Sequence, residues 1–192
     1  MNAPLMSAEF ENLLCTYCAP AMAGIKPASI VTCHKAKLPR LEQDLLGCRQ
    51  LLLAHGKRSR VLCQCEKHLV FMVYDPTALA ADLAEARSRR MLTALGYPRE
   101  ATAEQLLDEL SLRMQLHCGF PHEIGLFLGY PVRDVEEFIR QGGKDCLCTG
   151  YWKVYFDADR AKQRFAEFDA CRDDFLAQWE QGRCLSQILR VG

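Results

Sequence analysis

The residues whose types and spacing suit chemistry gather in one stretch, 120–155, with the sequence FPHEIGLFLGYPVRDVEEFIRQGGKDCLCTGYWKVY. His122 and Glu123 follow a proline at the start of an expected short helix, 122–128. An imidazole there can act as a general base or a ligand, and a carboxylate is stabilised by the helix dipole. Because Leu126 replaces the second histidine of H-E-x-x-H, the zinc-protease motif is absent. We treat His122 and Glu123 as candidate catalytic residues. The alternatives are that His122 only makes a structural hydrogen bond where the two segments join, and that Glu123 caps its own helix.

The end of the same stretch alternates aromatic and basic residues. On an expected strand over 146–156, Trp152 points away from Tyr151 and Lys153. An aromatic face beside a cation can stack a planar ligand, such as the edge of a flavin or haem. Tyr151, Trp152 and Lys153 are therefore candidate cofactor-binding residues, and Lys153 is also a third candidate catalytic residue. The alternative is an ordinary amphipathic strand.

Two C-x-C pairs, Cys63 with Cys65 and Cys146 with Cys148, lie on expected strands. Residues two apart on a strand point the same way, so each pair should present both thiols on one face. If the two strands were neighbours, four sulfurs would meet at a spacing that suits zinc or an iron–sulfur cluster. The usual zinc spacing is C-x-x-C, so half-buried structural thiols are the competing interpretation.

A third cysteine motif, Cys15 and Cys18 in C-T-Y-C, lies near the end of the first expected helix. A C-x-x-C at a helix start supports disulfide exchange, but here no clear strand precedes it, so core packing is favoured. The eleven cysteines are an odd number, so at least one thiol has no partner within the chain. The run MNAPLMSAEF lacks the features of a secretory signal, so we expect a cytoplasmic location and reduced thiols.

Composition indicates a single globular domain over residues 1–192, with 1–6 as a loose tail. Apolar residues make up 49% of the chain and charged ones 25%, as in ordinary globular proteins. The formal net charge is zero, which argues against nucleic acid as a partner. No run of about 18 apolar residues is present, so no membrane span is expected.

The periodicity of apolar residues predicts the elements that position these motifs. Residues 69–74 are apolar on both faces, which predicts a central strand, joined to 61–65 by a hairpin. Thr102 and Gln105 form a capping box, and Asp75-Pro76 starts another helix. The result is an α+β fold in which a small sheet of about four short strands packs with several helices. The expected helices are 8–18, 39–55, 76–95, 103–116, 122–128, 131–141, 158–181 and 184–190, and the expected strands are 29–33, 61–65, 69–74 and 146–156.

Several phrases of the chain resemble a known family. The blocks FPHEIGLFLGYP, DVEEFI and GYWKVY, with IKPAS upstream, are similar to the bacterial family known as domain of unknown function 3793. The resemblance covers most of the chain. It implies an origin mainly among anaerobic bacteria, and it brings no established activity and no catalytic residues.

Three hypotheses for the function follow from these residues. The first is a binding or accessory protein for a metal or redox cofactor. The second is an enzyme with a site around His122, Glu123 and Lys153. The third is a protein-interaction module without a small-molecule site. The expected partner is another protein or a small planar or anionic ligand. A polar pocket where 120–125 faces 151–155 would favour the enzyme, and a flat apolar patch the interaction module.

Overall fold

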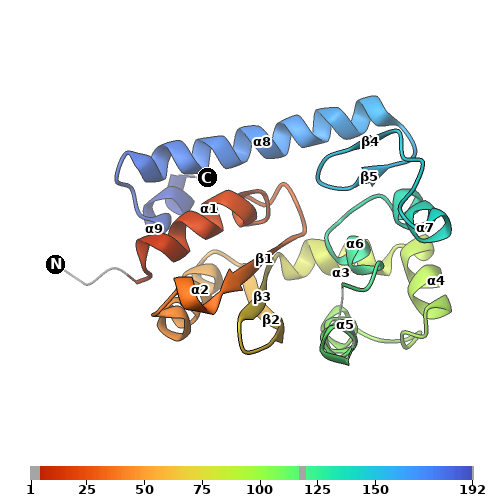
Figure 1. Cartoon of the computed structure of the whole chain (residues 1–192), viewed down its shortest axis with the longest axis horizontal. Coiled ribbons are helices and arrows are strands. Elements are labelled where there is room, and N and C mark those ends of the chain that lie inside the picture. Colours follow the sequence, from red (N-terminus) through yellow and green to blue (C-terminus); the bar gives the residue numbers. More distant parts are fainter. Residues whose placement is uncertain (1–4, 117–119, 192) are drawn as a thin grey trace.

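A three-stranded antiparallel sheet lies at the centre of the fold (Figure 1). The computed structural model describes residues 5–116 and 120–191. The segment 119–121, which was expected to separate the helices 103–116 and 122–128, lies partly outside these residues. Strand β3 (His68–Tyr74) lies between β1 (Ala28–His34) and β2 (Arg58–Gln64), so the prediction of a central strand over 69–74 is confirmed. Its near-continuous apolar sequence fits this position, because both of its faces are covered.

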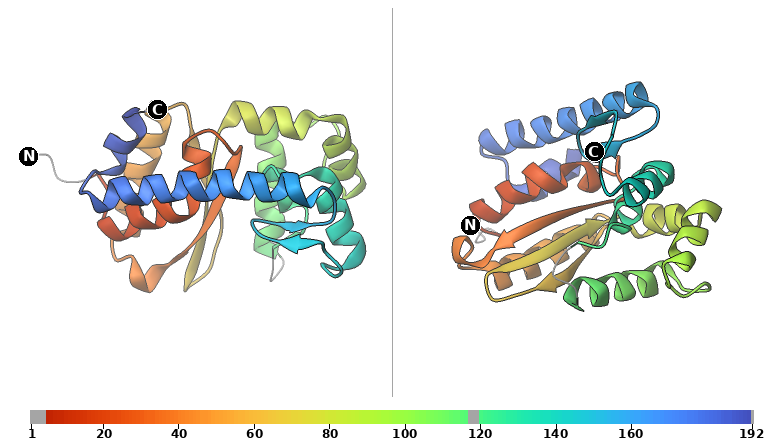
Figure 2. Two further views of the ribbon diagram at one scale, coloured as in Figure 1. Left: turned by 90° about the horizontal axis from the view of Figure 1, so that it is seen from above. Right: turned by 45° about the vertical axis from the view of Figure 1, so that its right-hand side comes forward.

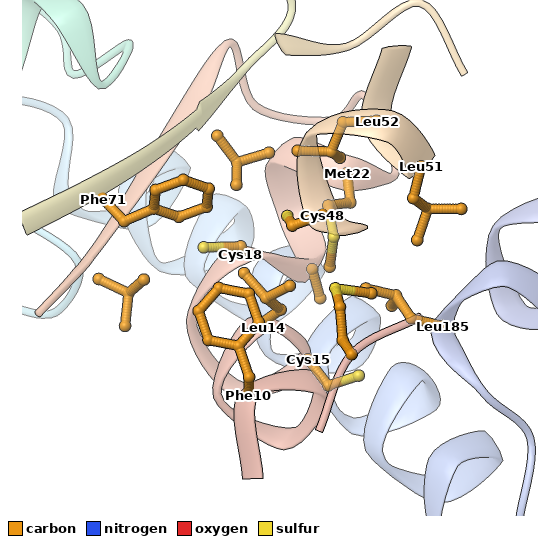
Figure 3. Close-up of a cluster of buried hydrophobic side chains, with 14 of the residues drawn as sticks. Phe10, Leu14, Cys15, Cys18, Met22, Cys48, Leu51, Leu52, Phe71 and Leu185 are labelled. Carbon is orange, nitrogen blue, oxygen red and sulfur yellow. The ribbon is translucent and has the colours of Figure 1, made fainter. Parts of the chain in front are cut away.

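The two faces of β3 carry two separate cores. Leu69, Phe71 and Val73 face helices α1 (Ala8–Met22) and α2 (Leu41–Ala54). The alternate residues Val70, Met72 and Tyr74 face α5 (Ala103–Leu116). Met6 is buried in the first core, so the predicted loose tail does not extend to residue 6. Figure 3 shows how closely the apolar side chains of the first core approach one another.

A long C-terminal helix forms a further layer. Helix α8 (Ala158–Glu180) runs along α1 on the side away from the sheet, as the two views of Figure 2 show. Asp157 caps the start of this helix, because its side chain accepts a hydrogen bond from the Arg160 amide at 3.3 Å. Helix α9 (Leu185–Ile188) folds back against the first core, and short 3₁₀ turns occupy Lys35–Lys37 and Leu189–Val191.

The segment between β3 and α5 differs from its prediction. The sequence predicted one helix over 76–95, but the chain forms α3 (Pro76–Ala84) and α4 (Ala86–Ala94). Glu85 separates them with an extended ψ of 135°, which a continuous helix does not permit. The start of α3 is as predicted: the carboxylate of Asp75 accepts the amides of Thr77 and Ala78, each at 2.9 Å.

The stretch 120–155 forms two helices and a small hairpin beside the sheet. Helices α6 (Ile124–Phe127) and α7 (Val132–Gln141) are followed by strands β4 (Cys148–Thr149) and β5 (Lys153–Val154). The predicted single strand over 146–156 is therefore wrong. The chain turns at Gly150, where a Cβ atom would lie 2.2 Å from the Phe165 ring of α8, so only glycine permits this contact. The turn carries Tyr151 and Trp152 between α7 and α8.

Candidate functional site

A cavity of about 220 Å³ lies where α6, α7 and the hairpin meet. Its walls are mostly apolar, and they come from segments that are up to 33 residues apart in the sequence. His122, Phe138 of α7, Trp152 and Lys153 are all among the lining residues. The lining residues are Phe120, Pro121, His122, Ile124, Gly125, Tyr130, Asp134, Val135, Phe138, Trp152 and Lys153.

His122 and Lys153 both contact the ring of Phe138. The centroid of the His122 ring is 5.1 Å from that of Phe138, and the two rings meet edge to face. The Lys153 Nζ atom lies 5.9 Å from the Phe138 centroid and donates a hydrogen bond of 2.7 Å to the carbonyl of Gly143. His122 is exposed, and its imidazole has no hydrogen bond to a described residue. Its imidazole is therefore available to a ligand.

Glu123 does not line this cavity. The residue is only 7% exposed, and its side chain turns toward Tyr97 and Arg113 rather than into the cavity. There it accepts hydrogen bonds from the Tyr97 hydroxyl at 3.1 Å and from the Arg113 guanidinium at 3.4 Å. Burial and the nearby Glu123 carboxylate raise the pKa of Tyr97. Glu123 also makes no capping hydrogen bond to its own helix, so both roles considered for it from the sequence differ from its observed contacts.

Asp134 orients one wall of the cavity, and the sequence analysis did not single it out. Its carboxylate is 3% exposed and accepts the indole N–H of Trp152 at 2.8 Å. Its other oxygen accepts the amides of Tyr155 at 3.0 Å and Phe156 at 3.1 Å. The only signal in the sequence was an acidic residue in the first turn of an expected helix. Such a residue is usually exposed to solvent and interacts with the helix dipole.

The three predicted cofactor-binding residues divide between two cavities. Trp152 packs between Tyr130, at 5.2 Å, and Phe165, at 4.5 Å between ring centroids, and it lines the first cavity with Lys153. Tyr151 instead faces α8, where its hydroxyl donates to Asp169 at 3.0 Å. Tyr151 lines a second cavity, of about 480 Å³, which Tyr130 also lines.

The second cavity contains a buried lysine that sequence reasoning missed. Lys26 lies between α1 and β1, within the IKPAS block, and is only 7% exposed. Its Nζ atom is 5.1 Å from the ring centroid of Tyr130 and 5.9 Å from those of Tyr151 and Phe168. Burial disfavours the charged form and lowers the pKa of Lys26 to about 8, while the thiol of Cys18 acts in the opposite direction. A lysine directly before a buried strand was the available signal.

The four cysteines predicted to share a metal do not converge. Cys63 lies at the end of β2 in the three-stranded sheet, with Cys65 just after that strand, whereas Cys148 lies in the separate two-stranded sheet, with Cys146 just before it. No group of three or more histidine, cysteine, aspartate or glutamate side chains within residues 5–116 and 120–191 is arranged to hold a metal ion. The predicted convergence is therefore wrong, because β2 and β4 are not neighbouring strands.

A bulge in β2 also changes the face that Cys63 occupies. Val61 pairs with Phe71, but Cys63 pairs with the next residue, Val70, because Leu62 is an extra residue in the ladder. Val61 and Cys63 thus lie on opposite faces, although residues two apart on a regular strand share one face. Cys63 packs against the second core, and Cys65 is exposed.

The C-x-x-C motif of α1 lies inside the first core, as Figure 3 shows. Cys15 and Cys18 are fully buried, close to Cys48 of α2. Burial raises the pKa of Cys15 to about 12, and it raises that of Cys18 well above its usual value. A redox-active C-x-x-C shows the opposite shift, so this geometry agrees with packing. All ten cysteines within the described residues carry free thiols.

The protein has an α+β fold with two aromatic-walled cavities of a size that suits small molecules. Tyr130, between α6 and α7, lines both. The chain belongs to the family described as protein of unknown function (DUF3793), whose family model matches residues 14–189. The resemblance of the IKPAS and FPHEIGLFLGYP blocks to this family is thereby confirmed. No curated protein and no solved structure shows significant similarity to the chain. Among the helices of the described residues, none has the length and apolar character needed to cross a membrane.

Proposed function

We propose that this protein is a binding or accessory protein that holds a small planar ligand with an anionic group in the cavity between His122 and Lys153. One observation carries the proposal: a histidine and a lysine 31 residues apart line the same aromatic-walled hollow. The cytoplasmic location expected from the sequence remains part of this proposal.

The size of the cavity limits the ligand. An apolar protein cavity of about 150 Å³ holds benzene, and drug-sized ligands occupy roughly 300–1,000 Å³. A volume of about 220 Å³ therefore suits one substituted ring or two fused rings. A flavin or haem would enter only by an edge, as the sequence analysis envisaged.

The polar groups of the cavity favour a negative charge on the ligand. Lys153 has no carboxylate partner among the described residues, and the Gly143 carbonyl takes only one of its three N–H donors. His122 offers a further nitrogen. The carboxylate of Asp134 already accepts three protein donors, so it does not compete for these groups.

The geometry favours this proposal over the other two hypotheses. An acid–base enzyme built on His122, Glu123 and Lys153 needs Glu123 in the same hollow, and Glu123 instead holds Tyr97 and Arg113. An interaction module without a ligand site would present a flat surface here rather than a cavity.

Benzoate, a single ring with one carboxylate, is a direct probe of the cavity. In a Trp179→Phe background Trp152 is the sole tryptophan, so its fluorescence reports occupancy. We expect saturable quenching by benzoate and weaker quenching by benzyl alcohol, which has the ring without the charge. His122→Ala and Lys153→Met should each weaken benzoate about tenfold, or about 1.4 kcal/mol. Lys144→Met is the matched control, because it removes an exposed charge nearby without touching the cavity.

Two results would contradict the proposal. The first is an absence of saturable binding by benzoate. The second is equal binding by wild type, His122→Ala and Lys153→Met. A His122→Ala variant that loses about 1–3 kcal/mol of stability and binds normally would assign His122 a structural role instead.

A further inference from the structure

The amine of Lys26 is a buried cation that has no counterion among residues 5–116 and 120–191. Its side chain is 7% exposed, lines the cavity of about 480 Å³, and donates no hydrogen bond to a described residue. We propose that Lys26 is a nucleophile that forms an imine with a small conjugated aldehyde or ketone entering this cavity. This site is distinct from the His122–Lys153 cavity, although Tyr130 lines both.

The backbone around Lys26 is fixed, so the direction of its side chain is defined. The amides of Ile25 and Lys26 both donate to the Pro20 carbonyl, at 3.0 and 3.1 Å. The Pro27 carbonyl accepts the Asp75 amide at 2.9 Å, and the Pro27 ring occupies the space where a Cβ on Gly129 would lie. The lysine is held on both sides and turned inward.

The groups around the amine leave it reactive. Arg172 of α8 lines the same cavity, but its guanidinium is already bound by Asp169 and Asp173, at 2.7 and 2.9 Å. Among the described residues, the other titratable groups that face Lys26 or line its cavity are Tyr17, Tyr130, Tyr151 and the buried thiol of Cys18. Among the described residues, therefore, no carboxylate pairs with the ammonium form, which is stabilised by the faces of the aromatic rings and by the thiol of Cys18.

Burial shifts the equilibrium of this amine toward the free base. With a pKa of about 8, about half of the Lys26 amines carry a lone pair at pH 8. An exposed lysine with a pKa near 10.4 has roughly one free base in 250 at that pH. Desolvation in an apolar pocket is one established way in which proteins activate a lysine nucleophile.

The proposed reaction is balanced without an external oxidant or reductant. The nitrogen lone pair attacks the carbonyl carbon, and the electrons of the C=O π bond move to oxygen, which takes a proton from water, while the nitrogen returns one of its protons to the hydroxide. The resulting carbinolamine loses its hydroxyl group together with the second nitrogen proton, as water, and forms the C=N bond. The products are an imine and one water molecule, and no atom changes its overall oxidation level relative to the carbonyl compound.

The walls of the cavity indicate the class of carbonyl compound. Tyr17, Tyr130 and Tyr151 supply flat apolar surfaces, and Ser29 contributes a hydroxyl group near the lysine. Offset or edge-to-face contact with such rings favours a planar conjugated ligand. The volume suits a compound larger than the one expected in the first cavity.

Reductive trapping tests the proposal. The full chain is incubated at pH 8 with benzaldehyde and sodium cyanoborohydride, and the benzylated residues are located by peptide mapping. We expect Lys26 to be modified at least tenfold faster than Lys162, which is exposed on α8. The mapping separates Lys26 from the N-terminal amine. The rate at Lys26 should rise with a midpoint near pH 8, whereas the rate at Lys162 should still be rising above pH 9.

Two lysine variants serve as controls for the labelling. Lys26→Met should abolish the adduct at this position, and Lys162→Arg should leave the Lys26 adduct unchanged. If Lys26→Met fails to fold, as judged by circular dichroism, the wild-type peptide map still decides the question. Equal or slower labelling of Lys26 relative to Lys162 would overturn the proposal and leave Lys26 as a cation–π contact between aromatic rings. Benzoate binding at Trp152 is scored separately, so either site can fail alone.

Discussion

Substitution of Asp134 in α7 should strongly lower the free energy of unfolding, because its carboxylate holds the β4–β5 hairpin. It joins α7 to the hairpin through three hydrogen bonds, to the indole of Trp152 and to the amides of Tyr155 and Phe156. Removing it takes away the acceptor that these three donors use among the described residues. The free energy of unfolding should therefore fall sharply in Asp134→Ala.

The magnitude follows from which donors lose access to water. Phe156 is exposed, so its amide can bond to water after the substitution. The Tyr155 amide and the Trp152 indole are more enclosed, and each unsatisfied donor costs about 1–3 kcal/mol. We expect a loss of about 3 kcal/mol in Asp134→Ala, which corresponds to a decrease in melting temperature of roughly 6–12 °C for a chain of this size.

Asp134→Asn separates the charge from the geometry. Its remaining oxygen can still accept the two backbone amides, but its NH₂ group faces the donor of Trp152, so only that bond is lost. We expect a loss of about 1–2 kcal/mol and a change in Trp152 fluorescence. Urea titration followed by circular dichroism gives both free energies. Asp159→Asn, at an exposed aspartate of α8, is the control and should change stability by less than about 1 kcal/mol.

The reasoning about Asp134 is refuted if Asp134→Ala unfolds within about 0.5 kcal/mol of the wild type. It is also refuted if Asp134→Asn loses as much as Asp134→Ala, because the two amide bonds would then contribute nothing.

Three further predictions concern glycine geometry, acid stability and thiol reactivity. Gly129 and Gly56 both have positive φ, of 72° and 68°, but only Gly129 has atoms where a Cβ would lie. Gly56→Ala should cost about 1 kcal/mol by urea titration, and Gly129→Ala should cost at least about 1 kcal/mol more; equal losses would contradict this. The hydrogen bond from Lys57 is the largest cause that lowers the pKa of Asp75. Its stabilising effect is present above the unfolded pKa of about 3.9 and is lost as pH falls through the lower folded value, so the stability difference between wild type and Asp75→Asn should shrink below about pH 4. A difference that stays constant from pH 6 to 2.5 would show that the charge does not matter. Cys65 is exposed and backbone hydrogen bonding lowers its pKa, so iodoacetamide should alkylate it before the buried thiols of α1, as mass spectrometry of the folded protein can show. Comparable rates at both places would contradict this.

Local signals in the sequence predicted most of the elements. The capping box of Thr102 and Gln105 forms as expected, with bonds of 2.8 and 3.3 Å, because both partners lie within one turn. The strand over 69–74 is central because its apolar residues leave no face for water. Gly142, with a φ of 60°, ends α7 as predicted.

Non-local contacts decided the elements that were predicted wrongly. Alternation from Cys146 to Phe156 is typical of one strand, but the approach of Phe165 to Gly150 folds it into a hairpin. The bulge at Leu62 changes the face of Cys63 without any glycine or proline to mark it. Periodicity reports only which residues are apolar, and it carries no information about which segments become neighbours.

The sequence by itself determined the class of fold, the central strand, the helix caps and a segment, 120–155, in which His122, Trp152 and Lys153 do line one cavity. Only the tertiary structure decided that Glu123 turns toward Arg113 and that Asp134 holds the indole. It also decided that Lys26 is buried. The physical reason is the same in each case: the environment of a charged side chain is set by groups that are distant in sequence, whereas caps and periodicity are set within one or two turns.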